Sequence, residues 1–310
     1  PLGFSSKAAA LLGQWAEVDL VDVPAPRLRD AFQDYDILWI RLAHRITAEL
    51  VINPIRCRIL ATPVTGLDHI DLDACIEAGI RVASLRGETE FLRTVRATAE
   101  LTLALLLALI RRIPHASQST LLGEWERDRF QGTELFGKTI GIIGMGRLGT
   151  IVAEYCRALG MKVIAYDPHQ EIPAQLARTM HSLPEILGLA DVISVHVNYH
   201  SGTRHLLNRE AFAQMKKGAV LVNTARGGVV DDTALLEYLQ NGHLAGAALD
   251  VLDGEPEIGE QHPLVAYARK QPNLLITPHI GGNTGESFEK TELFLAKKVE
   301  SYWNGMETMA

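Results

Sequence analysis

A glycine-rich turn, Gly144–Gly149 (Gly-Met-Gly-Arg-Leu-Gly), constrains this chain more than any other feature. It follows an apolar segment, 139–143, whose branched residues predict a buried strand, and it opens a predicted helix that Gly160 ends. In such a unit the first glycine permits a tight turn, the second lets phosphates approach the backbone, and the third lets helix and strand pack closely. The pattern alone is a weak signal, so its context carries the prediction of a nucleotide-binding unit.

The residue that ends the next predicted strand, 161–166, indicates which nucleotide binds. Asp167 stands about 20 residues beyond the turn, where a carboxylate accepts hydrogen bonds from ribose hydroxyls and repels a 2′-phosphate. Neither Pro168 nor His169 supplies an arginine that would reverse this preference. We therefore predict NAD rather than NADP as the cofactor. The alternative is a glycine-rich turn in a domain without a ligand.

The rest of the chain predicts two layered α/β domains, because 310 residues exceed the usual size of one domain. The first part alternates expected helices (5–15, 26–32) with expected strands (18–23, 37–42, 58–62). Since such domains usually begin with a strand, this order favours a first strand that precedes residue 1. One long helix, 97–113, is expected to end at Pro114 and to lead into the second domain. The predicted fold class is α/β with two doubly wound parallel sheets. Further strands are expected at 192–197, 219–223, 247–251 and 274–277, and a last helix, 286–303, is expected to pack back on the first domain.

Bulk properties exclude several classes of partner. The net charge of −7 leaves no broad basic surface for nucleic acid or anionic membranes. The longest apolar run, 101–110, has about half of the ~20 residues that a membrane span needs, and no signal-peptide pattern opens the chain. Cys57, Cys75 and Cys156 are far apart and lack zinc-site spacing, so we predict no metal site and a cytoplasmic location.

Three residues suited to proton and carboxylate chemistry, Arg226, Glu255 and His279, each follow a predicted strand in the second half of the chain. Ligands of open α/β sheets bind beyond the carboxyl ends of the strands, so these side chains are expected to converge. A histidine can donate or accept a proton near neutral pH, a carboxylate can orient it, and an arginine can bind a substrate carboxylate. Taken singly, each could instead be a surface ion-pair partner, a turn residue or a structural histidine.

The whole set of motifs resembles the D-isomer-specific 2-hydroxyacid dehydrogenase family, in its short, phosphoglycerate-dehydrogenase-like form. The resemblance implies a Rossmann NAD-binding domain, residues 96–283, and a flavodoxin-like substrate-binding domain, residues 1–95 and 284–310. It implies an NAD-dependent oxidoreductase that transfers a hydride between NAD(H) and a small D-2-hydroxy acid or 2-keto acid. It also implies a homodimer formed through the cofactor domain. The motifs are 66–71, 144–149 with 166–168, 190–196, 215–227, 249–256 and 277–281.

The resemblance also assigns roles to individual residues. Arg226 binds substrate, His279 is the acid and base, and Glu255 is its partner. The loop Val64, Thr65 and Gly66 binds the substrate carboxylate through backbone N–H groups, and Arg41 stands where related enzymes carry a substrate-side arginine. A solvated arginine at a strand end is an equal alternative for Arg41. The residues implied in cofactor binding are Gly144, Gly146, Arg147, Leu148, Gly149, Asp167, His196, Asn198, Thr203, Thr224, Ala225, Asp250 and Gly281.

Two departures from the family pattern leave alternatives open. The segment 86–100 is longer than usual and carries Arg86, Arg93 and Arg96, which are either solvated charges or contacts for a larger or more anionic substrate. Asn198 replaces a usual proline. A corepressor-like module that senses NAD and a phosphite-type dehydrogenase remain alternatives on the same scaffold. Formate oxidation is disfavoured, because formate enzymes carry glutamine where this chain has Glu255. The substrate's side chain and the physiological direction stay undetermined.

Overall fold

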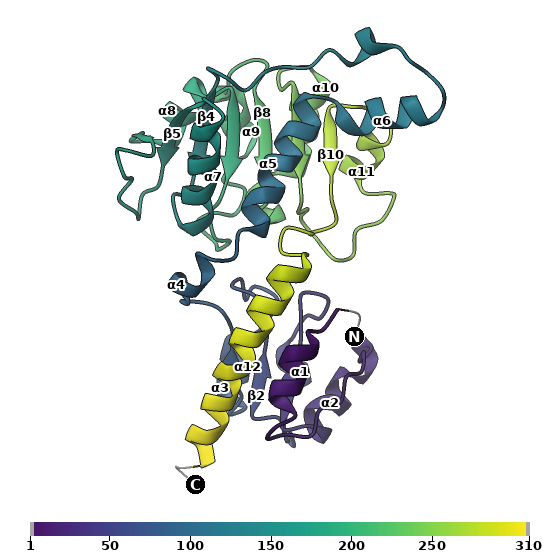
Figure 1. The fold of residues 1–310 in the computed structure, drawn as a ribbon, viewed down its shortest axis with the longest axis vertical. Coiled ribbons are helices and arrows are strands. Elements are labelled where there is room, and N and C mark those ends of the chain that lie inside the picture. The colour runs from purple at the N-terminus through teal and green to yellow at the C-terminus, as the bar shows by residue number, and fades with distance from the viewer. Residues whose placement is uncertain (1–2, 308–310) are drawn as a thin grey trace. The chain divides into compact units, whose positions relative to one another are not determined.

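The structure is a computed structural model that describes residues 3–307 of the chain. The chain forms two compact units: unit 1 comprises residues 1–95 and 282–310, and unit 2 comprises residues 96–281. The ends of unit 1 at residues 1–2 and 308–310 lie outside the described part. Each unit contains a parallel sheet flanked by helices (Figure 1), which confirms the predicted α/β class.

Unit 2 is built on a seven-stranded sheet with the order β10-β9-β8-β7-β4-β5-β6, in which every pairing is parallel. The chain builds outward from β4 in one direction and then returns to build from β7 in the other. The strand order therefore reverses between β4 and β7, which makes this sheet doubly wound and gives it a switch point. The strands are β4 (Thr139–Ile143), β5 (Lys162–Tyr166), β6 (Arg178–Thr179), β7 (Val192–Val195), β8 (Val220–Asn223), β9 (Gly246–Leu249) and β10 (Leu274–Ile276).

Helices cover both faces of this sheet. α5 (Ala97–Ile110) and α7 (Arg147–Ala158) lie side by side on one face (Figure 1), where Leu106, Ile142 and Val152 are buried together. The helices of the other face enclose a second apolar cluster. Each large aliphatic side chain buried in these layers contributes about 1.5–3 kcal/mol, which fixes the sheet between its helices. The second set is α8 (Leu183–Leu189), α9 (Arg209–Gln214), α10 (Asp232–Gln240) and α11 (Pro263–Ala268).

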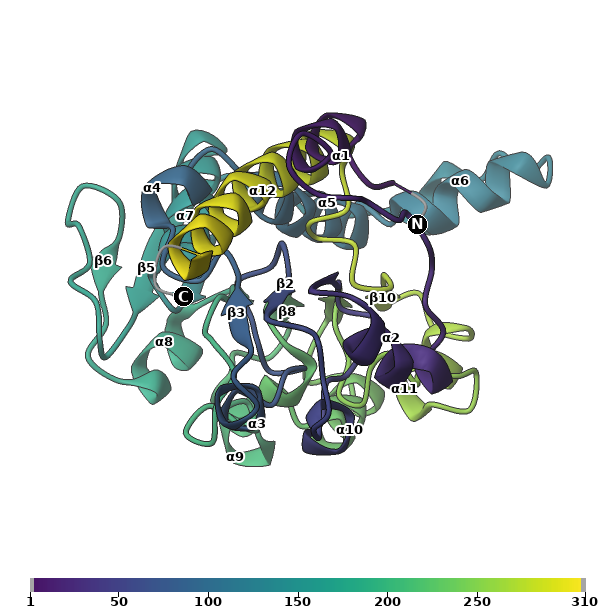
Figure 2. The ribbon, with the colours of Figure 1, turned by 90° about the horizontal axis from the view of Figure 1, so that it is seen from below.

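The prediction that Pro114 ends a long helix was wrong. α5 ends at Ile110, and a new helix, α6 (Ile113–Leu121), begins with Pro114 in its first turn. Arg112 has a φ of 54°, a left-handed conformation that interrupts the helical path between them. Proline is tolerated in a first helical turn because the N–H it lacks has no intrahelical partner there. α6 consequently projects away from the rest of unit 2 (Figure 2). Two short 3-10 helices complete the unit, η3 (Arg127–Phe130) and η4 (Gly227–Val229).

Unit 1 contains a three-stranded parallel sheet with the order β1 (Ile37–Trp39), β2 (Ile59–Ala61), β3 (Arg81–Ala83). The last helix, α12 (Gly285–Glu307), packs against α1 (Ser6–Leu12) and against β2 and β3, as predicted for the returning C-terminal segment (Figures 1 and 2).

No helix among the described residues is both long enough and apolar enough to cross a bilayer. The remaining elements are η1 (Ala25–Arg27), α2 (Leu28–Asp34), η2 (Ala48–Val51), α3 (Leu72–Glu77) and α4 (Thr89–Leu92).

The predicted strand at 18–23 was wrong, and β3 was not predicted. Residues 18–23 form no strand and pair with no strand among the described residues, and Leu20 and Val21 are half exposed. Their branched, apolar composition suits a strand, but a strand also requires a neighbour. β3 has only three residues and begins with Arg81, so its own pattern is weak, and its place depends on pairing with β2.

Candidate functional site

The glycine-rich turn has the geometry that its sequence predicts. Gly144 has a φ of 92°, and a Cβ there would lie 2.6 Å from the carbonyl oxygen of His196. A Cβ at Gly149 would lie 2.1 Å from the carbonyl oxygen of Gly144, so helix α7 can approach β4 only without it. A Cβ at Gly146 would have no atom within 4 Å. The first and third glycines are thus required by packing, whereas the second borders open space in which a ligand could lie.

This open space adjoins the N-terminus of α7, whose first N–H groups have no partner within the helix. Asp167 is held against the same turn, since its Oδ2 accepts the N–H of Met145 at 2.7 Å and its Oδ1 accepts the N–H of His169 at 2.8 Å. Oδ1 also accepts the N–H of Gln170 at 3.1 Å, and a carboxylate can accept about four hydrogen bonds, so Asp167 retains capacity for about one ribose hydroxyl. The N–H groups of a helix terminus and a fixed carboxylate beside it fit a dinucleotide.

His196, at the end of β7, offers a further polar atom on this side of the sheet. Its Nε2 lies 2.8 Å from the Ser194 hydroxyl, and its Nδ1 is shielded from solvent without a partner among the described residues. Burial lowers the pKa of His196 to about 4, so the ring is neutral at neutral pH. Nearby, the Thr203 hydroxyl donates to the Asn198 carbonyl at 2.7 Å, which closes an exposed turn. Thr203 therefore uses its hydroxyl hydrogen within the turn.

The predicted catalytic pair is assembled in unit 2. His279 Nδ1 lies 2.7 Å from Glu255 Oε1, and both side chains are about one quarter exposed (25% and 28%). His279 follows β10 with a φ of 53°, an uncommon conformation for a residue other than glycine, and its backbone N–H donates to the Asp250 carbonyl at 2.8 Å. The loop thus holds the imidazole in a fixed place, with Nδ1 bonded to the carboxylate and Nε2 available to a ligand.

Asp250, which follows β9, fixes this loop rather than standing free beside it. Its side chain is 1% exposed and accepts hydrogen bonds from the Thr277 hydroxyl at 2.5 Å and from the N–H groups of Ile280 at 2.9 Å and Gly281 at 2.7 Å. Burial raises the pKa of Asp250, while these hydrogen bonds act in the opposite direction. The sequence interpretation assigned Asp250 and Gly281 to cofactor binding. The structure shows that they bond to each other and shape the loop that carries His279.

Arg226 lies at the end of β8 on a loop that Asn223 organises. Asn223 is fully buried, its Oδ1 accepts the Ala225 N–H at 3.0 Å, and its Nδ2 donates to the Arg226 carbonyl at 2.9 Å. Thr224 is buried and donates to the Thr102 hydroxyl at 2.7 Å, because Thr102 donates its own hydrogen to the Thr98 carbonyl. Sequence reasoning missed Asn223. The available signal was an amide that ends an otherwise apolar strand, where its hydrogen bonds must be satisfied.

In unit 1 the predicted carboxylate-binding loop, Val64–Gly66, follows β2. Within the described residues, the backbone N–H groups of Val64, Thr65 and Gly66 have no hydrogen-bond partner. Successive free N–H groups favour an anion. Arg41, two residues beyond β1, is different, since its guanidinium is ion-paired with Glu292 and stacked on Phe288.

The three arginines of the 86–96 segment are all exposed. Arg96 pairs with Glu154 at 3.5 Å, and the ring centroid of Tyr155 lies 5.9 Å from its guanidinium carbon. Arg86 and Arg93 make no ion pair or hydrogen bond among the described residues through their side chains. These contacts are those of solvated surface charges.

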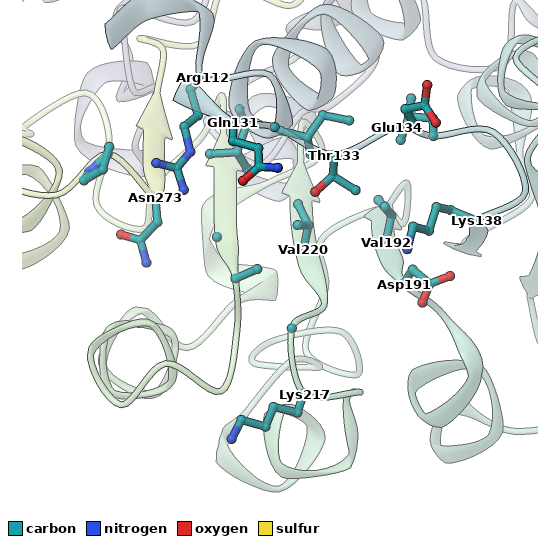
Figure 3. A pocket seen from close by; sticks show the side chains of 18 residues that line it. Arg112, Gln131, Thr133, Glu134, Lys138, Asp191, Val192, Lys217, Val220 and Asn273 are labelled. Carbon is teal, nitrogen blue, oxygen red and sulfur yellow. The ribbon is translucent and has the colours of Figure 1, made fainter. Parts of the chain in front are cut away.

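A cavity of about 310 Å³ lies elsewhere in unit 2 (Figure 3). It is lined by residues that precede or begin the strands, among them Lys138, Asp191, Lys217 and Asn273. This is the amino edge of the sheet, opposite to the edge that carries Arg226 and His279. The cavity contains none of the predicted site residues, so we place the candidate site at the carboxyl edge, where the constrained polar groups converge.

Comparisons with known proteins show the family to which the chain is related. Residues 103–281 match the family "D-isomer specific 2-hydroxyacid dehydrogenase, NAD binding domain". The chain is 35% identical over 304 residues to D-3-phosphoglycerate dehydrogenase of Methanocaldococcus jannaschii, covering 96% of this chain and 56% of that protein. It is 36% identical over 287 residues to hydroxypyruvate reductase of Thermotoga maritima, covering 91% of this chain and 90% of that protein.

A solved structure shares the fold as well. The crystal structure of TT0316 protein from Thermus thermophilus matches with a TM-score of 0.86 and 36% identity, over 97% of this chain and 95% of that one. The phosphoglycerate dehydrogenases are longer, and this chain spans about half the length of those relatives. From the family match and the assembled site together, we conclude that the chain belongs to the D-isomer-specific 2-hydroxyacid dehydrogenase family and carries its NAD-binding domain.

Proposed function

We propose that this chain is an NAD-dependent dehydrogenase that interconverts a small D-2-hydroxy acid and its 2-keto acid. The observation that carries the proposal is the Glu255–His279 pair at 2.7 Å, located at the same sheet edge as Arg226. The names of the relatives leave two substrate types open, one with a phosphate and one without.

The proposed roles follow from the contacts of each residue. NAD(H) would accept or supply the hydride at the substrate's C2. His279 gives a proton to the keto oxygen during reduction and removes it from the hydroxyl during oxidation. Glu255 bonds to Nδ1, which leaves Nε2 to carry the transferred proton and stabilises the charged ring. Arg226 binds the substrate carboxylate and polarises the keto group. Each reduction consumes one 2-keto acid, one NADH and one proton.

For the cofactor, we propose that Gly146, Arg147, Leu148 and the N-terminus of α7 hold the pyrophosphate and that Asp167 holds the adenosine ribose. The open space at Gly146 and the fixed Asp167 carboxylate support this assignment. His196 and the Asn198–Thr203 turn would border the adenine side, and Thr224, Ala225 and Asp250 the nicotinamide side.

For the substrate, we propose that Val64, Thr65 and Gly66 bind a carboxylate oxygen through their free N–H groups. Arg41 follows the neighbouring strand β1, on the same edge of the unit 1 sheet, so it would lie beside the bound substrate.

The direct experiment is NADH consumption with a panel of 2-keto acids, with NADPH in parallel. Turnover of at least one acid with NADH preferred supports the proposal. If NADH binds but no acid is reduced, the chain is not a dehydrogenase of this class, and a protein that only senses NAD becomes the better interpretation.

We also propose that the protein is a homodimer formed through unit 2. The segment from α6 to the start of β4 exposes large apolar side chains: Ile113 is 52% exposed, Leu121 85%, Trp125 86% and Phe136 80%. Such a concentration is uncommon on a monomer surface. Light scattering after size exclusion is expected to give twice the chain mass of 34.0 kDa, and Trp125→Glu is expected to weaken the dimer. A monomeric wild type contradicts this proposal without affecting the catalytic one.

A cytoplasmic location is likewise proposed. Cys57, Cys75 and Cys156 are all free and buried, and burial raises their pKa values to about 12, 11 and 12. Unpaired, protonated thiols suit a reducing compartment.

A further inference from the structure

We propose that Glu292 determines substrate specificity by neutralising Arg41, so that this site selects 2-keto acids whose side chain carries no charge. The inference rests on the proposed function and specifies its substrate class. The carboxylate of Glu292 is buried and has no role in the proposed chemistry.

Glu292 lies on α12 and is fully buried. One of its oxygens accepts a hydrogen bond from the Arg41 guanidinium, and the other accepts the Ser5 N–H at 2.6 Å. Phe288 lies one turn earlier on α12, and its ring centroid is 4.1 Å from the guanidinium carbon of Arg41. α12 therefore holds the arginine from two sides, by an ion pair and by an aromatic face.

The two partners of this ion pair differ in their access to water. The side chain of Arg41 is 29% exposed, whereas that of Glu292 is 0% exposed. A buried carboxylate that loses its paired cation is strongly unfavourable, because water cannot replace the cation. An incoming anion would have to compete with Glu292 for the guanidinium. We therefore expect the pair to persist when substrate binds.

The position of the pair connects it to the substrate. Arg41 follows β1 and the Val64–Gly66 loop follows β2, and the Ile40 N–H donates to the Ala61 carbonyl at 2.9 Å, which keeps the two strand ends together. Ligands of parallel sheets bind at this edge. The loop offers its free N–H groups to the one carboxylate that every 2-keto acid carries. A second anionic group on the substrate would gain little from Arg41, because Glu292 already compensates the positive charge of Arg41.

A second charge at this edge is compensated in the same way. Lys298, also on α12, lies 2.5 Å from Glu88 Oε1 and donates to the Ser84 carbonyl at 2.9 Å just beyond β3. α12 thus supplies the countercharge for both Arg41 and Glu88. Arg86 and Arg93 are exposed charges on the following segment, and they provide the competing route by which a phosphorylated acid could be bound.

The test compares kcat/KM for hydroxypyruvate and for 3-phosphohydroxypyruvate, with NADH as the reductant. The wild type is expected to prefer hydroxypyruvate by about 10-fold or more, the size of one charge-assisted hydrogen bond. Glu292→Gln frees the charge of Arg41 and keeps an oxygen acceptor, so it is expected to shift the ratio about 10-fold toward the phosphorylated acid. The shift should appear mainly in KM. Glu289→Gln is the matched control, because Glu289 is an exposed residue of the same helix that pairs with Lys7.

A paired replacement, Arg41→Met with Glu292→Met, keeps the test decisive if Glu292→Gln folds poorly, since it leaves no charge buried. It is expected to retain the wild-type ratio. A wild type that prefers the phosphorylated acid, or a ratio that Glu292→Gln leaves unchanged, would overturn the inference while the dehydrogenase proposal stands. Absence of turnover with every acid would overturn both.

Discussion

The two edges of the unit 2 sheet differ in what they present to a ligand. The amino edge borders a cavity of about 310 Å³, with charged side chains such as Lys138 and Lys217 around it. The carboxyl edge carries Asn223, Asp250 and His279. Hydrogen bonds hold the side chains of Asn223 and Asp250, and His279 has an uncommon backbone φ of 53°. At the amino edge, Asp191 accepts the Thr139 N–H and pairs with Lys216, which joins strand to loop.

This difference shows that the presence of a cavity does not by itself mark the place where reactive groups are held. The amino edge has volume, but its charges serve local structure or face solvent. The carboxyl edge fixes a histidine, its carboxylate partner and an arginine within a few loops, and such fixed geometry is what acid and base catalysis needs.

The largest effect is expected from His279→Gln at the carboxyl edge. Loss of the proton donor should lower kcat by about 10³-fold, within the usual range for general acid–base catalysis. NADH binding, measured by fluorescence titration, should remain. Lys217→Ala at the amino edge is the control and should leave kcat within about twofold. Equal losses for both variants would contradict the assignment of the site to one edge.

Asp250→Asn should lower the free energy of unfolding and also slow the catalysed reaction. The amide cannot accept at both oxygen positions, so a buried N–H of the His279 loop loses its acceptor at a cost of about 2 kcal/mol. Urea unfolding measures this change, and kcat/KM should fall about 10-fold as the loop loosens. Asp191→Asn is the matched control and should cost less than about 1 kcal/mol, because that carboxylate is partly solvated. A larger loss at Asp191 would reverse the comparison.

Asp167→Asn should change cofactor choice rather than stability. The amide removes the negative charge that repels a 2′-phosphate and retains an oxygen for the Met145 N–H. The ratio of kcat/KM for NADPH to that for NADH is expected to rise about 10-fold, roughly 1.4 kcal/mol. An unchanged ratio would mean that another residue selects the cofactor.

The smallest effect is expected at Asp232, where α10 begins. Burial first, and then the charges of Asp253 and Asp231, raise its pKa to about 7, and His262 lies 3.5 Å away. The folded protein therefore holds this proton more tightly than the unfolded chain, and the free energy of unfolding should fall as pH rises from about 4 to 7. Asp232→Asn should raise that free energy by about 1 kcal/mol at pH 8 and leave it unchanged near pH 4. A gain of equal size at both pH values would exclude this titration as its cause.

Several elements show how far the sequence alone could predict this molecule. The strand, glycine turn and helix around Gly144 were predicted as they stand, because their pattern is short-range: Gly144 takes the left-handed φ that a tight turn needs, and Gly149 packs against the Gly144 carbonyl. Pro114 was misread, since proline both ends helices and begins them, and the choice depended on Arg112 adopting a left-handed conformation. The segment 18–23 has the composition of a strand but pairs with no strand in the described part of the chain, and composition alone does not indicate whether a pairing partner is available.

The chemical groups that this chain offers can be identified from its sequence: a nucleotide turn, an acidic residue that favours NAD, and an arginine, a glutamate and a histidine in a fixed order. These follow from residue type and from short-range spacing, which the chain carries without folding. Only the tertiary structure decided which charges are still available. Arg41 is neutralised by Glu292, which lies 251 residues away along the chain, and the His279 loop is held by Asp250 from another strand. Such pairings depend on which helix and strand ends the fold brings together, and burial then makes them strong.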